Sequence, residues 1–186
     1  MHRDKDAIYQ ELLALRCGRG DRAALEELVV CWEKRLYYFI RQLVDDEQDA
    51  WDILQQTWLR VLRGIGSLKD PQRLTAWLYR IARNTAFSHS RLQAAYRAHL
   101  EEHPDTEWLD QDDTEFDREN AEQVHVALRR LPAVQREVLT LFFLEDLAIE
   151  EIADVVGIPP GTVKSRLFHA KRALRKILEE ESARHE

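Results

Sequence analysis

Apolar residues recur every three or four positions along most of the chain, which is the spacing of a helix that buries one face. The pattern is clearest over residues 22–43, where the apolar positions are Leu25, Leu28, Val29, Trp32, Leu36, Phe39, Ile40 and Leu43. Asp21 immediately precedes this stretch and can cap the helix with its carboxylate. Glycine and proline are few and β-branched runs are short, so the sequence predicts an all-α protein.

A second helix is expected from Asp45 or Asp46 to Leu62, with an inner face of Ala50, Ile53, Leu54, Thr57, Trp58, Val61 and Leu62. Residues 45–52 hold five acids and no base. At a helix start such acids cap the backbone and suit the helix dipole. Capping does not account for a polar face that continues along the helix, formed by Asp49, Asp52, Gln55 and Gln56. A protein-docking face would explain it.

A third helix is expected after the loop SLKDPQRL, with a buried side formed by Leu74, Trp77, Leu78, Ile81, Ala82, Thr85 and Phe87. Its outward side mixes arginines with aromatic and amide residues, namely Arg73, Trp77, Tyr79, Arg80, Arg83, Asn84, His89 and Arg91. Cations that hold phosphates and rings that stack on unpaired bases suit single-stranded nucleic acid. The alternative is a solvated basic face above an aromatic core, and for Trp77 itself a core position is favoured.

The most specific pattern lies in residues 131–178. A helix begins at Leu131-Pro132, with proline in its first turn, and its core-facing residues are Val134, Val138, Leu139, Leu141, Phe142 and Leu144. In the following LAIEEIADVVGIPPGTVKSRL, Ala153 lets two helices cross closely, Gly157 allows a positive φ, and Val163 packs back. This spacing indicates a DNA-binding helix-turn-helix. A plain helical hairpin is the alternative.

The second helix of this motif carries the candidate DNA contacts, which are Thr162, Lys164, Ser165, Arg166, His169, Lys171, Arg172 and Arg175. Residues near its start are expected to reach base edges, and those further along to contact the phosphate backbone. Residues 159–178 hold six bases and no acid, which suits a polyanionic partner. The final EEESARHE is interpreted as a short acidic tail beyond this helix.

Charge is distributed unevenly, although the formal net charge is only -7. Residues 60–97 hold eight bases and one acid, whereas residues 99–122 hold eleven acids and one base. The acid-rich stretch lacks helical apolar spacing, so we interpret residues 98–120 as a linker between two helical domains. It also contains isolated apolar residues that either pack on a domain face or anchor on a partner, namely Trp108, Leu109 and Phe116.

Composition and sequence pattern limit where the protein is expected to be located and which chemistry it is expected to perform. No apolar run approaches the roughly 18 residues of a membrane-spanning helix, and the N-terminus lacks the apolar core of a signal peptide. A cytoplasmic location without membrane insertion is therefore expected. Cys17 and Cys31 are expected to be free thiols, with a redox-active disulfide or a metal site as the alternative. No cofactor, metal site or catalytic residue is predicted.

Three segments together resemble the extracytoplasmic-function class of bacterial RNA polymerase sigma factors, within the sigma-70 family. DAWDILQQTWLRVLRGI resembles its core-polymerase-binding helix, TAWLYRIARNTAFSHSR its promoter −10 segment, and LPAVQREVLTLFFLEDLAIEEIADVVGIPPGTVKSRLFHAKRALRKIL its −35-binding domain. They occur in the family's order and cover about residues 10–178. The resemblance implies a domain for core polymerase and the −10 element at 10–97, the linker at 98–120, and a −35 domain at 121–180.

The resemblance also implies partners and roles. The positions expected to dock on the clamp helices of the polymerase β′ subunit are Asp49, Asp52, Ile53, Gln55, Gln56 and Thr57. The −10 segment captures a flipped base of the non-template strand, and its candidate contacts are Lys69, Arg73, Trp77, Arg80, Arg83 and Asn84. Further expected partners are the polymerase β flap, promoter DNA in duplex and single-stranded form, and an anti-sigma factor.

Two stretches depart from the family pattern: residues 87–90 are Phe-Ser-His-Ser where Asp or basic residues are frequent, and His169 replaces a frequent basic residue. A stand-alone helix-turn-helix repressor or activator is the main alternative, but it gives the acidic helix and linker no role. A carboxylate metallo-hydrolase built on Asp45, Asp49 and Asp52 lacks a nearby histidine. The favoured prediction is a sigma factor, not an enzyme, that gives core polymerase promoter specificity and aids −10 strand opening in a stress or envelope response.

Overall fold

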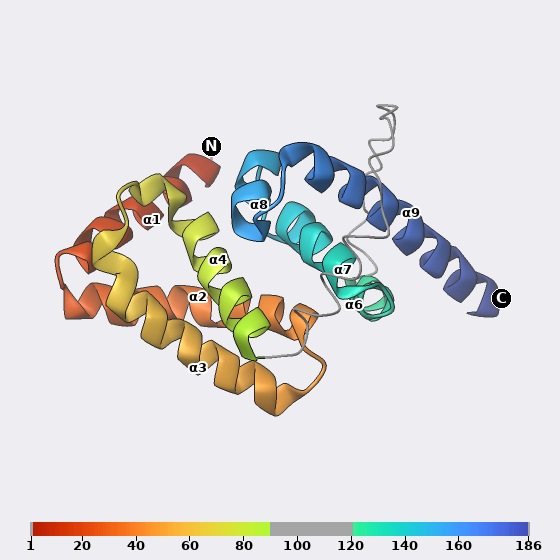
Figure 1. The fold of residues 1–186 in the computed structure, drawn as a ribbon, viewed down its shortest axis with the longest axis horizontal. Coiled ribbons are helices and arrows are strands. Elements are labelled where there is room, and N and C mark those ends of the chain that lie inside the picture. Colours follow the sequence, from red (N-terminus) through yellow and green to blue (C-terminus); the bar gives the residue numbers. More distant parts are fainter. Residues whose placement is uncertain (1, 90–120, 186) are drawn as a thin grey trace. The chain divides into compact units, whose positions relative to one another are not determined.

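The computed structural model describes residues 2–89 and 121–185, which fall into two compact units. The first comprises helices α1 to α4, and the second consists mainly of helices α6 to α9 (Figure 1). Every element in these two ranges is helical, which confirms the all-α class. None of the described helices has the length and apolar character needed to cross a membrane. The predicted linker at 98–120 and Arg91 lie outside the described residues.

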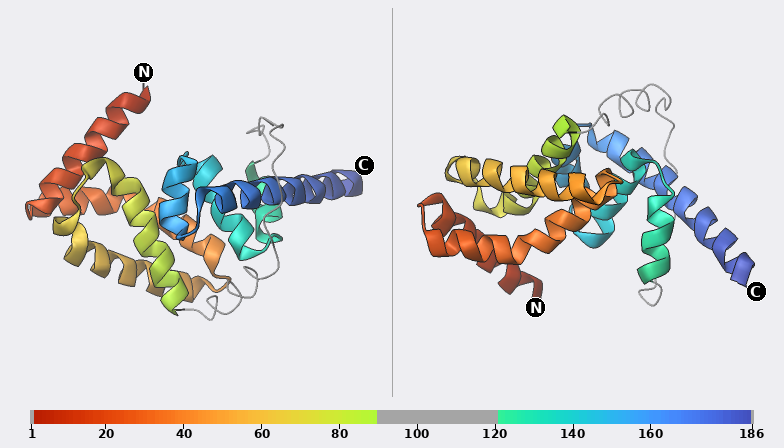
Figure 2. Two further views of the ribbon diagram at one scale, coloured as in Figure 1. Left: turned by 45° about the horizontal axis from the view of Figure 1, so that its top comes forward. Right: turned by 90° about the horizontal axis from the view of Figure 1, so that it is seen from below.

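Four helices and two short 3-10 turns build the first unit: α1 His2–Gly18, α2 Arg22–Leu43, α3 Glu47–Gly64, η1 Ile65–Ser67, η2 Pro71–Arg73 and α4 Leu74–His89. Helices α2 and α3 form an antiparallel pair, and α4 packs against both (Figure 1). Helix α1 packs on α2 and on the two 3-10 turns (Figure 2). The four helices therefore enclose a single core.

Both predicted N-caps of this unit are confirmed. The Asp21 carboxylate accepts a hydrogen bond from the Ala24 amide at 3.1 Å, at the start of α2. The Asp46 carboxylate accepts one from the Asp49 amide at 2.9 Å, at the start of α3. Each cap satisfies a backbone donor that has no partner inside its helix, so local chemistry fixes where these two helices begin.

Aromatic rings fill the centre of the first unit. Trp32 and Phe39 of α2 meet Tyr79 of α4 edge-on, with ring centroids 5.8 and 5.0 Å apart. All three residues are fully buried. The prediction that Tyr79 faces outward is therefore wrong, because α2 and α3 both pack against α4 and cover more of its circumference than a single buried stripe.

Two predicted core positions are exposed instead. Leu62 is 46% exposed and Leu144 is 45% exposed. Leu62 lies nine residues after the buried Ile53, which is two and a half helical turns, so it points to the opposite side of α3. Leu144 ends a π-helical turn, whose wider winding rotates its side chain away from the position that an α-helix predicts.

The second unit contains α6 Ala121–Arg129, α7 Ala133–Leu139, the π-helical turn η4 Thr140–Leu144, α8 Ile149–Val156 and α9 Pro160–His185. Helices α6 and α7 both pack along α9. Its buried residues include Leu128, Leu131, Val134, Val138, Leu139, Leu141, Leu147, Ile152, Val163, Leu167 and Leu174. Most of the apolar positions predicted for the helix-turn-helix core are thus confirmed.

The turn between α8 and α9 is confirmed at Gly157. Its φ of 74° and ψ of 36° are left-handed, and its amide donates to the Ala153 carbonyl at 2.8 Å. A β-carbon at this glycine would meet no heavy atom within 4 Å. The need for glycine is therefore conformational rather than steric.

Helix α9 runs without a break to His185 (Figure 2), so the predicted tail after Leu178 is part of the helix. The residues that follow Leu178 are mostly glutamate, alanine and arginine, which have high helix propensity. Glu180 also lies 3.7 Å from the Arg130 guanidinium, which ties this part of α9 to the end of α6.

Candidate functional site

The acid-rich N-terminal half of α3 presents a polar face. Asp49 and Asp52 are half-buried, whereas Gln55 and Gln56 are exposed. These four side chains are therefore available to a partner protein, as the sequence predicted. The carboxylate of Asp46 accepts a hydrogen bond from the Asp49 amide at 2.9 Å, so it has a structural role as the N-cap of α3.

Two of the predicted docking residues on α3 do not reach the surface. Ile53 and Thr57 are both fully buried. The Thr57 hydroxyl donates to the Ile53 carbonyl at 2.7 Å, one turn earlier in the same helix. The prediction that they contact a partner is wrong, because the side of α3 that carries them packs against α2 and α4.

Sequence reasoning missed three exposed apolar side chains on α3. Trp51 is 40% exposed, Leu59 52% and Leu62 46%. With Gln55 they follow the i, i+4, i+8, i+11 spacing of one helix face. This spacing can be seen in the sequence, but the buried apolar face of α3 has a similar spacing. Only the packing of α3 against its neighbours shows which apolar face is buried and which is exposed.

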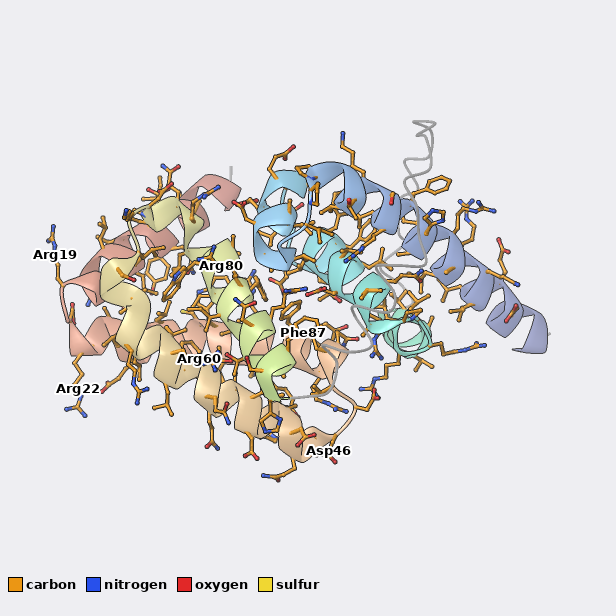
Figure 3. The ribbon with its side chains drawn as sticks, viewed as in Figure 1. Arg19, Arg22, Asp46, Arg60, Arg80 and Phe87 are labelled. Carbon is orange, nitrogen blue, oxygen red and sulfur yellow. The ribbon has the colours of Figure 1, made fainter. Side chains whose placement is uncertain are left out.

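The loop between α3 and α4 and the exposed side of α4 form the second candidate surface. Lys69 and Arg73 of the loop are exposed, and so are Arg80 and Asn84 of α4, which are one turn apart. The loop is held in shape, because the Ser67 hydroxyl donates to the Gly64 carbonyl at 2.7 Å and the Asp70 carboxylate accepts from the Gln72 amide at 3.1 Å. Figure 3 shows Arg80 on α4.

Arg83 is not part of this exposed surface. Only 7% of the residue is exposed, and its guanidinium lies 4.4 Å from the ring centroid of Phe87, one turn further along α4. The prediction that Arg83 projects outward is wrong, because a stack on the aromatic ring lets the guanidinium lie against the protein. Arg83 therefore packs against the end of α4 and has little exposed surface.

Trp77 has a largely structural position. It is half-buried, and a β-carbon built on Gly64 would lie 3.2 Å from its ring. The absence of a side chain at Gly64 lets the indole approach the end of α3. This supports the core position that was favoured for Trp77 and leaves only part of the residue to a ligand.

Helix α9 forms the third candidate surface, and all eight predicted contacts lie on its first sixteen residues. Lys164, Arg172 and Arg175 are exposed, whereas the half-buried members are Thr162, Ser165, Arg166, His169 and Lys171. Sequence reasoning missed Phe168, which is 40% exposed among these bases. A basic helix that follows a tight turn and leaves polar side chains exposed suits the major groove of duplex DNA.

Aromatic rings hold two of these cations in place. The Lys171 ammonium lies 5.2 Å from the ring centroids of both Phe142 and Phe143 in the π-helical turn. The Arg172 guanidinium lies 5.7 Å from the ring of Phe168. Such cation–π contacts restrict side chains that would otherwise sample many rotamers. The π-helical turn thus has a direct effect on the basic surface.

A separate polar cluster joins α1 to α2. The Arg16 guanidinium contacts Asp21 at 2.9 Å and Glu27 at 3.2 Å, and the Tyr9 hydroxyl donates to Glu27, which raises the pKa of Tyr9 to about 12. Burial raises the pKa of the Cys17 thiol. Cys17 and the exposed Cys31 are free thiols, as predicted. In the part of the chain that the structure describes, no three His, Cys, Asp or Glu side chains converge as metal ligands.

Comparison with known proteins matches a different family to each half of the chain. The family described as Sigma-70 region 2 matches residues 28–96, and Sigma-70, region 4 matches residues 121–174. The chain is 34% identical over 180 residues to the RNA polymerase sigma-H factor of Pseudomonas aeruginosa, covering 90% of this chain and 92% of that one. It is 32% identical over 179 residues to the ECF RNA polymerase sigma factor SigM of Mycobacterium tuberculosis, covering 95% of this chain and 86% of that one.

Two solved structures share the fold. One is CnrH in complex with the cytosolic domain of CnrY, with 24% identity, a TM-score of 0.64 and coverage of 92% of this chain and 97% of that one. The other is the sigma factor RpoE in complex with the anti-sigma factor NepR from Bartonella quintana, with 24% identity and a TM-score of 0.63. It covers 83% of this chain and 96% of that one.

Proposed function

Because the chain belongs to the extracytoplasmic-function class of sigma-70 family RNA polymerase sigma factors, we propose that its two units divide promoter recognition between them. As a sigma factor it is a DNA-binding initiation factor that directs core polymerase to promoters. In our proposal the domain at 10–97 binds core polymerase and the −10 element, residues 98–120 connect the domains, and the domain at 121–180 binds the −35 element.

One observation carries this division of labour. A single chain combines an acid-rich, exposed helix face on α3 with a basic helix-turn-helix that ends in α9. The first cannot bind DNA, since five acids within 45–52 repel phosphates. A stand-alone helix-turn-helix regulator accounts for the second feature only, whereas a sigma factor needs both. A protein that works on core polymerase also works in the cytoplasm.

For the polymerase contact we propose the surface residues Asp49, Asp52, Gln55 and Gln56 of α3, docked on the clamp helices of β′. Ile53 and Thr57 support this face from below, because both are buried under it. The β flap is the proposed partner of the second unit. Charged and amide groups at the rim of such an interface favour a unique docking geometry and a fast encounter.

The double change Asp52→Ala with Gln55→Ala is expected to weaken core binding by about tenfold, since it removes one half-buried charge and one amide from the proposed interface. Affinity is measured by titrating labelled protein with purified core polymerase, and promoter-directed transcription is measured with the same preparations. The change Leu12→Ala on the exposed side of α1 is the control. Unchanged core affinity in the double variant would remove this face from the interface.

For the −35 element we propose that α9 lies in the major groove. Lys171→Ala and Arg175→Ala are each expected to weaken holoenzyme binding to duplex −35 DNA for every sequence, and to lower the salt slope by about one unit, because each removes a phosphate contact. Arg166→Ala is expected to cost about 1–3 kcal/mol and to relax preference at one position, as loss of a base contact does. Identical behaviour of all three variants would make Arg166 a phosphate contact.

We also propose that an anti-sigma factor regulates this chain. The fold likeness to CnrH bound to CnrY and to RpoE bound to NepR supports the proposal. An anti-sigma factor that covers the α3 face would block polymerase without touching DNA. The test is a transcription assay in which the candidate anti-sigma domain is added to the chain before core polymerase. Transcription is expected to be lost.

A further inference from the structure

A stacked aromatic pair lies at the surface beside the acidic face of α3. The rings of Tyr37 in α2 and Trp51 in α3 have centroids 4.3 Å apart and planes 29° from parallel. Trp51 remains 40% exposed, and Tyr37 is half-buried. The tyrosine therefore supports the indole from one helix while the indole presents surface to solvent from the other. An exposed tryptophan in a fixed orientation is the type of residue that anchors protein interfaces.

Two carboxylates flank Trp51 along α3. Glu47 lies one turn before Trp51 on α3, is exposed, and accepts a hydrogen bond from the Tyr37 hydroxyl at 3.5 Å. Asp52 follows Trp51 and is half-buried. The connection between α2 and α3 is held in place, since the Arg41 guanidinium donates to the Val44 and Asp45 carbonyls at 3.1 and 2.7 Å. The aromatic surface and its acidic border are thus organised before any partner binds.

The chemistry of this surface selects one kind of side chain. A nucleic-acid base could stack on the indole, but its phosphates would meet the carboxylates. A second copy of the chain would bring two acid-rich faces together, with five acids and no base within 45–52 on each. A guanidinium satisfies both features at once, because it stacks on an aromatic face and donates paired hydrogen bonds to carboxylates.

We infer that Trp51, supported by Tyr37 and bordered by Glu47 and Asp52, binds an arginine side chain of core polymerase. The inference rests on the proposed function, because Asp52 and Gln55 of the proposed polymerase face adjoin Trp51 on α3. It adds a contact from the α2–α3 pair that the acidic face alone does not supply. The arginine lies over the indole, and its guanidinium edge points to the carboxylates.

Three substitutions of Trp51 distinguish an arginine stack from plain apolar contact. Trp51→Ala is expected to weaken core binding by about 30-fold, which is the size of an interface hot spot. Trp51→Phe keeps an aromatic face and is expected to stay within about threefold of wild type. Trp51→Met keeps apolar area without the ring, and is expected to bind about tenfold more weakly than Trp51→Phe.

The measurements are titrations of full-length variants with purified core polymerase, together with thermal denaturation to verify folding. Leu12→Ala, a truncation at an exposed apolar position of α1, is the matched control and should bind like wild type. Equal affinities for Trp51→Phe and Trp51→Met would overturn the arginine stack, and wild-type affinity of Trp51→Ala would overturn the site. Failure of the wild-type chain to bind core polymerase would instead overturn the proposed function, and with it this inference.

Discussion

Holoenzyme that carries Lys69→Ala, Arg80→Ala and Asn84→Ala is expected to reach its promoter and leave the −10 region double-stranded. Opening unpairs and unstacks bases at a cost of a few kcal/mol for each flipped base, so the exposed strand must be captured. The structure leaves these three side chains exposed on the loop and on α4. At about 1 kcal/mol for each lost contact, the opening equilibrium falls more than about a hundredfold.

Permanganate reactivity of single-stranded thymines near −10 measures this opening directly. Core affinity and −35 binding should remain at wild-type levels, and a template with a pre-opened bubble should recover much of the lost transcription. Arg19→Ala with Arg22→Ala, at the exposed turn between α1 and α2 (Figure 3), is the control for a general loss of positive charge. Normal opening of duplex promoter by the triple variant would show that other residues form the melting surface.

Trp32→Ala is expected to destabilise the first unit by about 3–5 kcal/mol, the usual effect of truncating a buried aromatic side chain. Trp32 is fully buried, its ring meets Tyr79 edge-on, and its indole N–H donates to the Gln10 side chain at 2.8 Å. The substitution therefore leaves a cavity and removes a contact that joins α1 to α2. Since a domain of this size is stable by only about 5–15 kcal/mol, much of the unit's stability is lost.

Denaturant titration followed by circular dichroism measures the effect, and full-length protein is used throughout. Leu12→Ala, at an exposed position, should change stability by no more than about 0.5 kcal/mol. Loss of core binding and of −10 opening should accompany the loss of stability, because both proposed surfaces are built on this unit. A stability loss below about 1 kcal/mol would mean that the helices collapse into the vacated space.

Features set by local chemistry were predictable from the sequence. Asp21 and Asp46 cap helices because their carboxylates reach amides three residues away, and Gly157 adopts a left-handed φ that other residues avoid. Each depends on neighbours in the chain and on little else.

Features set by packing were not predictable in the same way. For Ile53 and Thr57 the apolar spacing predicted an inner face whereas the family resemblance implied a partner contact, and packing against α2 and α4 buries both residues. Arg83 follows Arg80 by three residues on α4, and packing distinguishes the two, because Arg83 is buried and stacks on the Phe87 ring. The π-helical turn at Thr140–Leu144 has no sequence signal of its own, and it moves Leu144 to the surface. In each case a neighbouring side chain or helix determines whether the residue is buried or exposed.

The continuity of α9 gives the proposed DNA-binding helix opposite charges at its two ends. It is one rod of 26 residues, about 39 Å long at 1.5 Å per residue, with six bases from Lys164 to Lys176 and three consecutive glutamates from Glu179. Next to a polyanion such a rod experiences a torque, since one end is attracted and the other repelled. In the proposed −35 complex the acidic end is therefore expected to turn away from the duplex, which disfavours a helix inserted the wrong way round before any base is contacted.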